Sequence, residues 1–193
     1  ASCNDISTAD VITYDSNLTF NMFDCLSARD KNTFELLSDF GFENITMVLD
    51  PTFLSNSYMK QLVDVKLKNY IIVYGHNFNE EQISIIKKIA TKQSKKLVSI
   101  TKYYEWCDKN IIASPFEFLS YIKNADYIIT STFHGSVFSI VFEKNFICFV
   151  ENKNKVSDLL EKFDLQDRIF NDFDSGLNLL NKNIDYTKVN ELK

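Results

Sequence analysis

The sequence is poor in glycine, proline and cysteine motifs. Only four glycines and two prolines occur in 193 residues, and no low-complexity tract, glycine-rich linker or internal repeat is present. The four cysteines form no Cys-x-x-Cys pair, so we interpret them as reduced thiols, with a disulfide as the less favoured alternative.

Long apolar runs and an excess of positive charge are also missing. No run reaches the roughly 18 apolar residues of a membrane span, and the N-terminus lacks the charged-then-apolar plan of a signal peptide. The net charge of -5 argues against nucleic-acid binding, which requires a basic surface. What the chain does have is 45% hydrophobic residues, enough for an ordinary core. Because it begins at Ala1 without Met, we expect a piece of a longer protein.

The hydrophobic pattern predicts alternating strands and helices. Strands are predicted over residues 23–28, 45–49, 69–75, 96–101, 126–131 and 145–150, and helices over 31–40, 80–92, 114–125, 135–143 and 156–163. Ser114, Pro115 and Glu117 form the capping-box pattern of a helix start. Strands that are apolar on both faces and alternate with amphipathic helices predict an α/β fold with a doubly wound parallel sheet.

The pattern also suggests two parts. Residues 1–55 carry few strands, so we interpret them as the end of a preceding α/β domain or a linker region. Residues 56–193 read as a C-terminal Rossmann-like domain with a helical tail, which the family resemblance described below makes a donor-binding domain.

The turn after the strand at 126–131 carries the main candidate site. Ser131, Thr132, His134, Gly135 and Ser136 lie between this strand and the next helix. In open α/β sheets ligands bind beyond the carboxyl ends of the strands, where helix N-termini offer unpaired amides to an anion. We therefore predict a phosphate or carboxylate site here, with His134 supplying charge or a proton.

A purely structural interpretation of the same turn stays open. The hydroxyls can cap the helix, Gly135 can relieve a tight turn, and His134 can be a hydrogen-bonded structural residue. The sequence has no Gly-x-Gly-x-x-Gly or Walker motif, which argues against a Rossmann dehydrogenase and a P-loop NTPase.

Three segments together resemble the polysaccharide pyruvyl transferase family. The segment "SPFEFLSYIKNADYIITSTFHGSVFSIVFEKNFICF" shares its Ser-Pro-x-x-Phe, its Ala-Asp before a strand and its Phe-His-Gly turn. The segments "LSARDKNTFELLSDFGFENITMVLDPTFL" and "KVSDLLEKFDLQDRI" match its Ser-x-Arg-Asp, Val-x-Asp-Pro-Thr and Leu-x-x-Arg patterns. The similarity extends from about residue 20 to 188, in the same order and spacing.

The resemblance implies the C-terminal part of a two-domain, GT-B-like protein. It implies a bacterial enzyme that transfers a pyruvyl group, as a ketal, from phosphoenolpyruvate to a sugar of a cell-surface polysaccharide or its precursor. Two alternatives stay open: a GT-B-like glycosyltransferase that uses a sugar nucleotide, and a family member that binds ligand without catalysis. The fragment is expected to be inactive alone.

The resemblance also implies roles for particular residues. It makes His134 the catalytic residue and places Ser131, Thr132, Gly135 and Ser136 among the substrate-binding residues. Many relatives have Arg where this chain has Thr132, and a hydroxyl cannot replace a bidentate guanidinium. Arg29 is the expected substitute, unless Asp30 neutralises it.

Five further positions or segments complete the prediction. His76 and Asn152 follow strand ends and are candidate substrate contacts, although such polar residues are often turn formers. Lys155 is favoured as a solvated lysine, the Asp50-Pro51-Thr52 segment as a structural turn, and Trp106 as packing on a helix face rather than a sugar platform.

The expected ligands follow from the same resemblance. The predicted reaction uses phosphoenolpyruvate as donor substrate and no cofactor or metal. The expected partner is a saccharide acceptor, free or lipid-linked, and neither a nucleic acid nor a transmembrane segment is expected. The expected location is cytoplasmic or peripheral at the inner membrane face.

Overall fold

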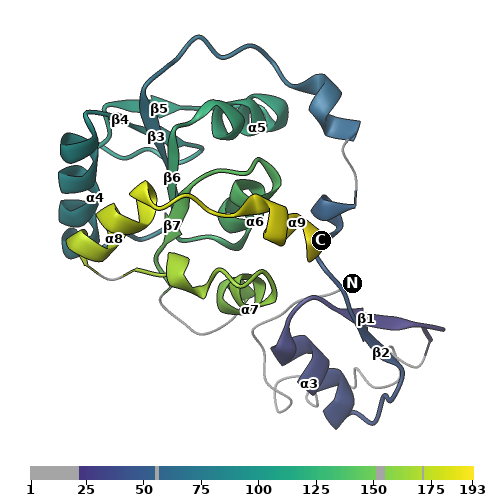
Figure 1. Cartoon of the computed structure of the whole chain (residues 1–193). Coiled ribbons are helices and arrows are strands. Elements are labelled where there is room, and N and C mark those ends of the chain that lie inside the picture. Colours follow the sequence, from purple (N-terminus) through teal and green to yellow (C-terminus); the bar gives the residue numbers. More distant parts are fainter. Residues whose placement is uncertain (1–21, 55–56, 151–154, 171) are drawn as a thin grey trace.

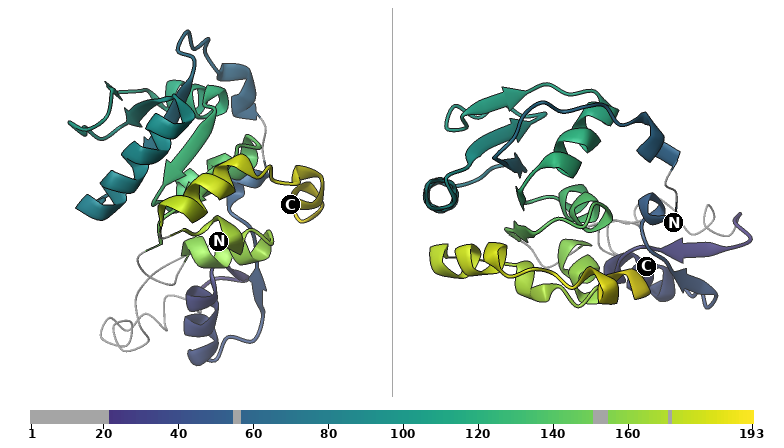
Figure 2. Two further views of the ribbon diagram at one scale, coloured as in Figure 1. Left: turned by 60° about the vertical axis from the view of Figure 1, so that its left-hand side comes forward. Right: turned by 45° about the horizontal axis from the view of Figure 1, so that its top comes forward.

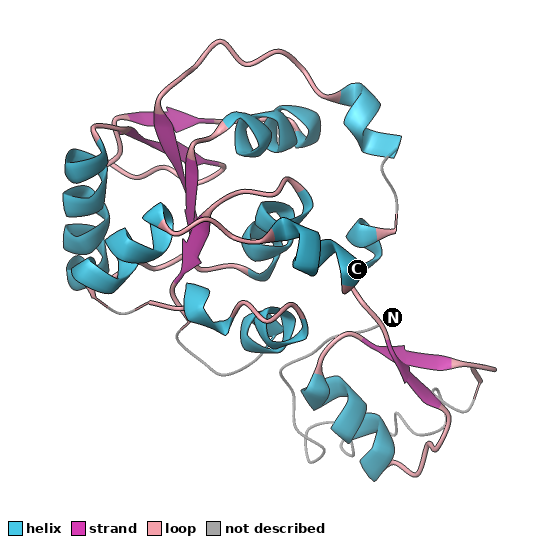
Figure 3. Cartoon of the chain, viewed as in Figure 1, coloured by secondary structure: helices cyan, strands magenta, loops and turns pink. Residues whose placement is uncertain are grey.

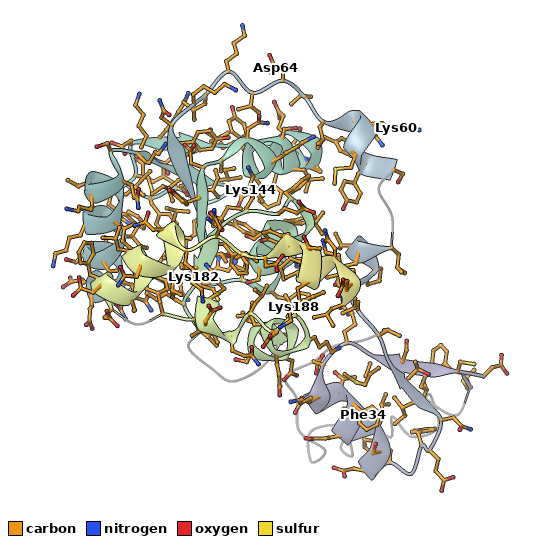
Figure 4. The ribbon with its side chains drawn as sticks, viewed as in Figure 1. Phe34, Lys60, Asp64, Lys144, Lys182 and Lys188 are labelled. Carbon is orange, nitrogen blue, oxygen red and sulfur yellow. The ribbon has the colours of Figure 1, made fainter. Side chains whose placement is uncertain are left out.

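Within the residues that the structure describes, the first unit combines a small parallel sheet with a helix. The computed structural model describes residues 22–54, 57–150, 155–170 and 172–193. Strand β1 (Leu26–Ala28) pairs in parallel with β2 (Ile45–Met47), and helix α3 (Lys31–Asp39) connects them. Two short 3-10 helices, η1 (Pro51–Phe53) and η2 (Ser57–Gln61), follow. Figure 4 shows Phe34 of α3 in this unit, apart from the side chains around the larger sheet.

Local sequence explains where α3 begins and ends. The Asp30 carboxylate accepts a hydrogen bond from the Thr33 amide at 2.8 Å, which caps the first turn. Leu36 and Leu37 are buried. Gly41 follows the helix with φ = +85°, a conformation that favours glycine and ends the helix.

The second unit is built on a five-stranded parallel sheet, in the order β5-β4-β3-β6-β7. The strands are β3 (Tyr70–Tyr74), β4 (Lys96–Ile100), β5 (Lys109–Ile111), β6 (Tyr127–Thr130) and β7 (Phe146–Cys148). The strand order reverses between β3 and β6, because β4 and β5 extend to one side of β3 and β6 and β7 to the other. This is the topological switch point, where ligands bind in open α/β sheets.

Helices cover both faces of this sheet, as Figures 1 and 3 show. They are α4 (Glu80–Gln93), α5 (Pro115–Asn124), α6 (Phe133–Val141), α7 (Lys155–Lys162), η3 (Gln166–Arg168), α8 (Phe173–Asn181) and α9 (Tyr186–Glu191). Helices α4 and α8 lie on one face, whereas α5, α6 and α7 lie on the other. The predicted doubly wound α/β fold is confirmed.

Alternate residues of each central strand supply two separate cores. In β3, Tyr70 and Ile72 join the core under α5, α6 and α7, whereas Ile71 and Val73 join the core under α4 and α8. Successive side chains of a strand point to opposite faces, so a sheet covered on both faces needs strands that are apolar throughout. This requirement is why the pattern predicted the central strands correctly.

The connection between β4 and β5 differs from the prediction. No strand was predicted at 109–111, because β5 is short and polar, and Trp106 was expected on a helix face. Instead, residues 101–108 cross the sheet without a helix. Tyr104, Trp106 and buried Cys107 pack against the core on the α4 side and fill the space that a crossover helix would occupy.

Helix α7 joins the first unit to the second. Its Asp158 carboxylate accepts a hydrogen bond from the Lys31 amide at 2.8 Å, and its Lys162 ammonium donates to the carbonyl oxygens of Arg29 at 3.2 Å and Val48 at 3.3 Å. The rings of Phe53 and Phe163 lie 5.3 Å apart. The first unit thus lies beside α7, outside the layers of the larger sheet (Figure 2). The domain boundary near residue 55 stays a prediction.

None of the described helices combines the length and the apolar character that a membrane crossing requires. Cys25, Cys107 and Cys148 are free thiols, and Cys3 lies outside the described residues.

Candidate functional site

The candidate site lies where β3 and β6 end side by side. Tyr74 pairs with Thr130 in the parallel register, so the residues that follow both strands reach the same edge of the sheet. The Ser131 amide donates to the Tyr74 carbonyl at 3.3 Å, which extends the pairing by one residue. The turn carrying His76 and the turn carrying Ser131 to Ser136 are therefore neighbours, as predicted from their strands.

Thr132 and Gly135 build the start of α6. The Thr132 hydroxyl caps the helix by accepting a hydrogen bond from the Gly135 amide at 3.0 Å. A Cβ on Gly135 would lie only 2.0 Å from Oγ1 of Thr130, so no side chain fits there. Ser136 is fully buried, and its hydroxyl donates to the Thr132 carbonyl at 3.3 Å. These three residues shape the helix start in this structure.

Two amides at this helix start point to an anion-binding capacity. Within the described ranges, the backbone N–H groups of Phe133 and His134 have no hydrogen-bond acceptor. Such orphan donors, at the positive end of the helix dipole, favour a phosphate or carboxylate group.

Both histidines of the chain are exposed at this edge. The His134 ring has its centroid 5.5 Å from that of Phe133 and 6.3 Å from that of Phe138. Neither imidazole makes a hydrogen bond to a described residue. The structural alternative for His134, a satisfied hydrogen-bonded side chain, therefore finds no partner in the described part of the chain.

Hydroxyl groups hold the turn after β3. The carbonyl oxygens of Tyr74, Gly75 and His76 accept hydrogen bonds from Thr130 Oγ1 at 2.6 Å, Tyr104 Oη at 2.9 Å and Ser131 Oγ at 3.3 Å, respectively. Ser131 Oγ also accepts a hydrogen bond from the His76 amide at 3.0 Å. A Cβ on Gly75 would lie 2.4 Å from Ser131 Oγ. Glycine is therefore required for this close approach.

Arg29 lies in the first unit, and its described contacts place it beside α7. Its guanidinium forms an ion pair with Asp50 rather than with Asp30. Asp50 is buried and also accepts the Thr52 amide at 2.9 Å. Burial would raise the pKa of Asp50, but the Thr52 hydrogen bonds and the Arg29 charge outweigh it, so this pKa lies below its usual 3.8. The role of Arg29 as a donor contact stays a prediction.

The remaining predicted positions contribute little to the site geometry. Asn152 lies outside the described residues. Lys155 is the first residue of α7 and is half-buried. Asp50 caps η1 through Thr52, in agreement with its structural interpretation.

Two supporting residues were given no role by the sequence analysis. Tyr104 reaches the site from the crossover loop, as its hydrogen bond to the Gly75 carbonyl shows. Arg168, from the Leu-x-x-Arg pattern, is buried and donates from Nη1 to the carbonyl oxygens of Leu179 at 2.8 Å and Lys182 at 3.2 Å. It therefore ties η3 to the end of α8.

No cluster suited to a metal ion occurs among the described residues. A pocket of about 500 Å³ lies elsewhere, between the first unit and the C-terminal helix, and it is lined by Thr52, Phe53, Tyr58, Met59, Val141, Glu143, Asn190 and Lys193. It contains no residue of the β3 or β6 turns. This pocket is therefore not part of the candidate site.

The chain belongs to the polysaccharide pyruvyl transferase family. The family profile described as "Polysaccharide pyruvyl transferase" matches residues 15–153, which is well over half of the chain and includes both turns of the site. No curated protein is matched by the sequence.

Solved structures show the same fold at low sequence identity. The UDP-GlcNAc 2-epimerase of Methanocaldococcus jannaschii, in complex with UDP-GlcNAc and UDP, is 15% identical with a TM-score of 0.53, and the match covers 93% of this chain and 64% of that one. The S. aureus MnaA-UDP structure is 15% identical with a TM-score of 0.51, covering 88% and 53%. The chain thus spans little more than half the length of these proteins, and its fold is GT-B-like and Rossmann-type.

Proposed function

We propose that the chain is the donor-binding part of a pyruvyl transferase, which moves a pyruvyl group from phosphoenolpyruvate to a sugar of a polysaccharide or its precursor. The family match carries this proposal, because it includes the β6–α6 turn with its exposed His134. The acceptor saccharide, free or lipid-linked, approaches the open edge of the sheet, and the reaction uses no cofactor or metal.

The donor anion binds at the start of α6. The amides of Phe133 and His134 donate to its phosphate or carboxylate oxygens, and the helix dipole supports the negative charge. The Thr132 hydroxyl accepts a hydrogen bond from the Gly135 amide at 3.0 Å. Thr132 therefore caps the helix, and the anion is bound by the two amides and the His134 imidazole. Arg29 is a further candidate contact.

The chemistry requires one proton and two hydroxyl groups. The methylene carbon of phosphoenolpyruvate gains a proton, and a sugar hydroxyl adds to the central carbon and loses its own proton, so this addition leaves the proton count unchanged. A second hydroxyl of the sugar then displaces phosphate from that carbon and closes the ketal, and its proton leaves with the phosphate. The products are the pyruvyl ketal and inorganic phosphate.

His134 serves as the acid or as the phosphate partner in this sequence. An imidazolium can give the proton to the methylene carbon or stabilise the departing phosphate, and either role contributes typically about 100-fold or more to the rate. Its exposed position at the first turn of α6 leaves it accessible to a bound donor.

A titration tests the proposal against its alternatives. The chain is titrated by calorimetry with phosphoenolpyruvate and, separately, with UDP and UDP-GlcNAc, the ligands of the epimerase with the same fold. We expect saturable binding of phosphoenolpyruvate that weakens in His134→Ala. Binding of the nucleotides alone would favour the sugar-nucleotide glycosyltransferase. Binding of phosphoenolpyruvate without pyruvyl transfer by the full-length protein would favour the noncatalytic family member.

A further inference from the structure

Two hydroxyl groups form hydrogen bonds with the peptide group that joins Gly75 to His76. The carbonyl oxygen of Gly75 accepts a hydrogen bond from Tyr104 Oη at 2.9 Å, and the amide of His76 donates to Ser131 Oγ at 3.0 Å. These two atoms belong to the same planar peptide unit. Fixing both sides of the plane fixes the direction in which the His76 backbone leaves β3.

Tyr104 is itself held firmly in the crossover loop. Its amide donates to Asn110 Oδ1 at 2.7 Å, and its carbonyl accepts from Asn110 Nδ2 at 3.0 Å. Its ring centroid lies 5.0 Å from that of Trp106 and 5.8 Å from that of Phe78. Burial, and to a lesser extent the nearby Cys107, raises the pKa of Tyr104, so the phenol keeps its proton and remains a donor.

Of the two neighbouring tyrosines, only Tyr104 supports the turn that carries His76. Tyr103, the preceding residue, is 71% exposed, whereas Tyr104 turns inward to the Gly75 carbonyl. His76 is exposed at the end of β3, beside the β6–α6 turn that carries His134. The His76 imidazole makes no hydrogen bond to a described residue, and its backbone is held by two other segments, the crossover loop and the end of β6. This is a preorganised arrangement.

We propose that Tyr104 is a positioning residue that holds His76 where its imidazole contacts the anionic group of the donor. This inference rests on the proposed function, since it takes phosphoenolpyruvate as the ligand. Tyr104 acts through the Gly75–His76 peptide and does not touch the donor. Ser131 holds the other side of the same peptide.

The first test is the Tyr104→Phe variant, which removes one hydroxyl and keeps the ring. We expect the dissociation constant for phosphoenolpyruvate, measured by calorimetry, to rise about 3- to 10-fold, the size of one lost hydrogen bond. Tyr103→Phe is the matched control and leaves the dissociation constant unchanged. In a His76→Gln background, Tyr104→Phe adds no further loss, because both changes act through the same imidazole. An equal loss with and without His76 would contradict the proposal.

A ligand-free measurement separates this inference from the proposed function. The chain has two histidines, so its NMR spectrum contains two imidazole spin systems, which His76→Gln assigns. Tyr104→Phe should shift or broaden the His76 signals and leave those of His134 in place, and circular dichroism verifies that the variant is folded. If the parent chain fails to bind phosphoenolpyruvate, the proposed function is wrong, together with the donor contact of His76. The spectrum still decides whether Tyr104 positions His76, and unchanged His76 signals would overturn that role.

Discussion

The carboxyl ends of the two sheets carry similar polar residues but use them differently. At the end of the small sheet, the charged groups have partners: Arg29 forms an ion pair with Asp50, and the Lys162 ammonium donates to the Arg29 and Val48 carbonyls. At the end of the β3–β6 pair, polar side chains bind the backbone and leave both imidazoles exposed.

This difference distinguishes the small sheet, whose polar groups serve stability, from the β3–β6 edge, which is the candidate site. The Arg29–Asp50 ion pair lies within the first unit, and Lys162 hydrogen-bonds that unit to α7, so the loss of these groups should affect stability first. Exposed imidazoles on a fixed backbone contribute little to folding, so their loss should affect chemistry first. Substitutions at the two edges test this contrast directly.

The largest expected effect is on catalysis at the β3–β6 edge. In the full-length protein, His134→Ala should lower pyruvyl transfer about 100-fold or more, because a proton donor or phosphate partner is lost. Its melting temperature should stay close to that of the parent. Steady-state kinetics and calorimetric unfolding measure both quantities, and activity equal to that of the parent would exclude the catalytic role.

Asp50→Ala should show the opposite behaviour. Removing this buried carboxylate leaves the partly buried Arg29 guanidinium without that partner, and we expect the free energy of unfolding to fall by about 2–3 kcal/mol. Urea unfolding measures the loss. Lys31→Gln is the control, since its ion pair with Glu161 is largely exposed and should leave the midpoint unchanged.

The Asp50 contribution to stability should also be lost in acid. The pKa of Asp50 is depressed in the folded state relative to its usual 3.8, so its contribution is present above that value and is lost as the pH falls through the folded pKa. The difference in unfolding free energy between the parent and Asp50→Asn should therefore shrink below pH 3.8. A difference that stays constant down to the acid unfolding transition would show that the Asp50 charge is not responsible.

The smallest effect that still distinguishes the two regions comes from the glycines. Gly135→Ala forces a Cβ to within 2.0 Å of Thr130 Oγ1, and we expect a loss of about 1–3 kcal/mol in unfolding free energy from overpacking, together with weaker donor binding. Gly41 has φ = +85°, and a Cβ placed there would meet no other atom within 4 Å. Gly41→Ala should therefore lower the free energy of unfolding by about 1–2 kcal/mol, through backbone strain alone, and leave donor binding unchanged. Equal donor binding by both variants would show that the start of α6 does not contact the donor.

Much of the fold could be predicted because its determinants are local. The Asp30 and Ser114 caps, Gly41 and the uniformly apolar central strands each act within a few residues. The short β5 and the aromatic crossover at 101–108 could not be predicted, because β5 exists only through its pairing with β4. No local periodicity indicates such an edge strand.

The site was predictable only in part. That Ser131 to Ser136 and His76 meet at one edge follows from strand ends and parallel pairing. The sequence did not show that Ser131 binds the His76 peptide, that Arg29 pairs with Asp50 rather than Asp30, or that Tyr104 reaches Gly75. Each of these contacts joins residues at least 21 positions apart.

The amino-acid sequence by itself determined a doubly wound parallel sheet, the turn that presents His134 and the family to which the chain belongs. Only the tertiary structure decided which polar groups are consumed by partners and which stay available to a ligand. The physical reason is that apolar periodicity and helix capping are set by neighbours along the chain, whereas the pairing of a carbonyl, hydroxyl or charge depends on what distant segments bring within 3 Å or so of it.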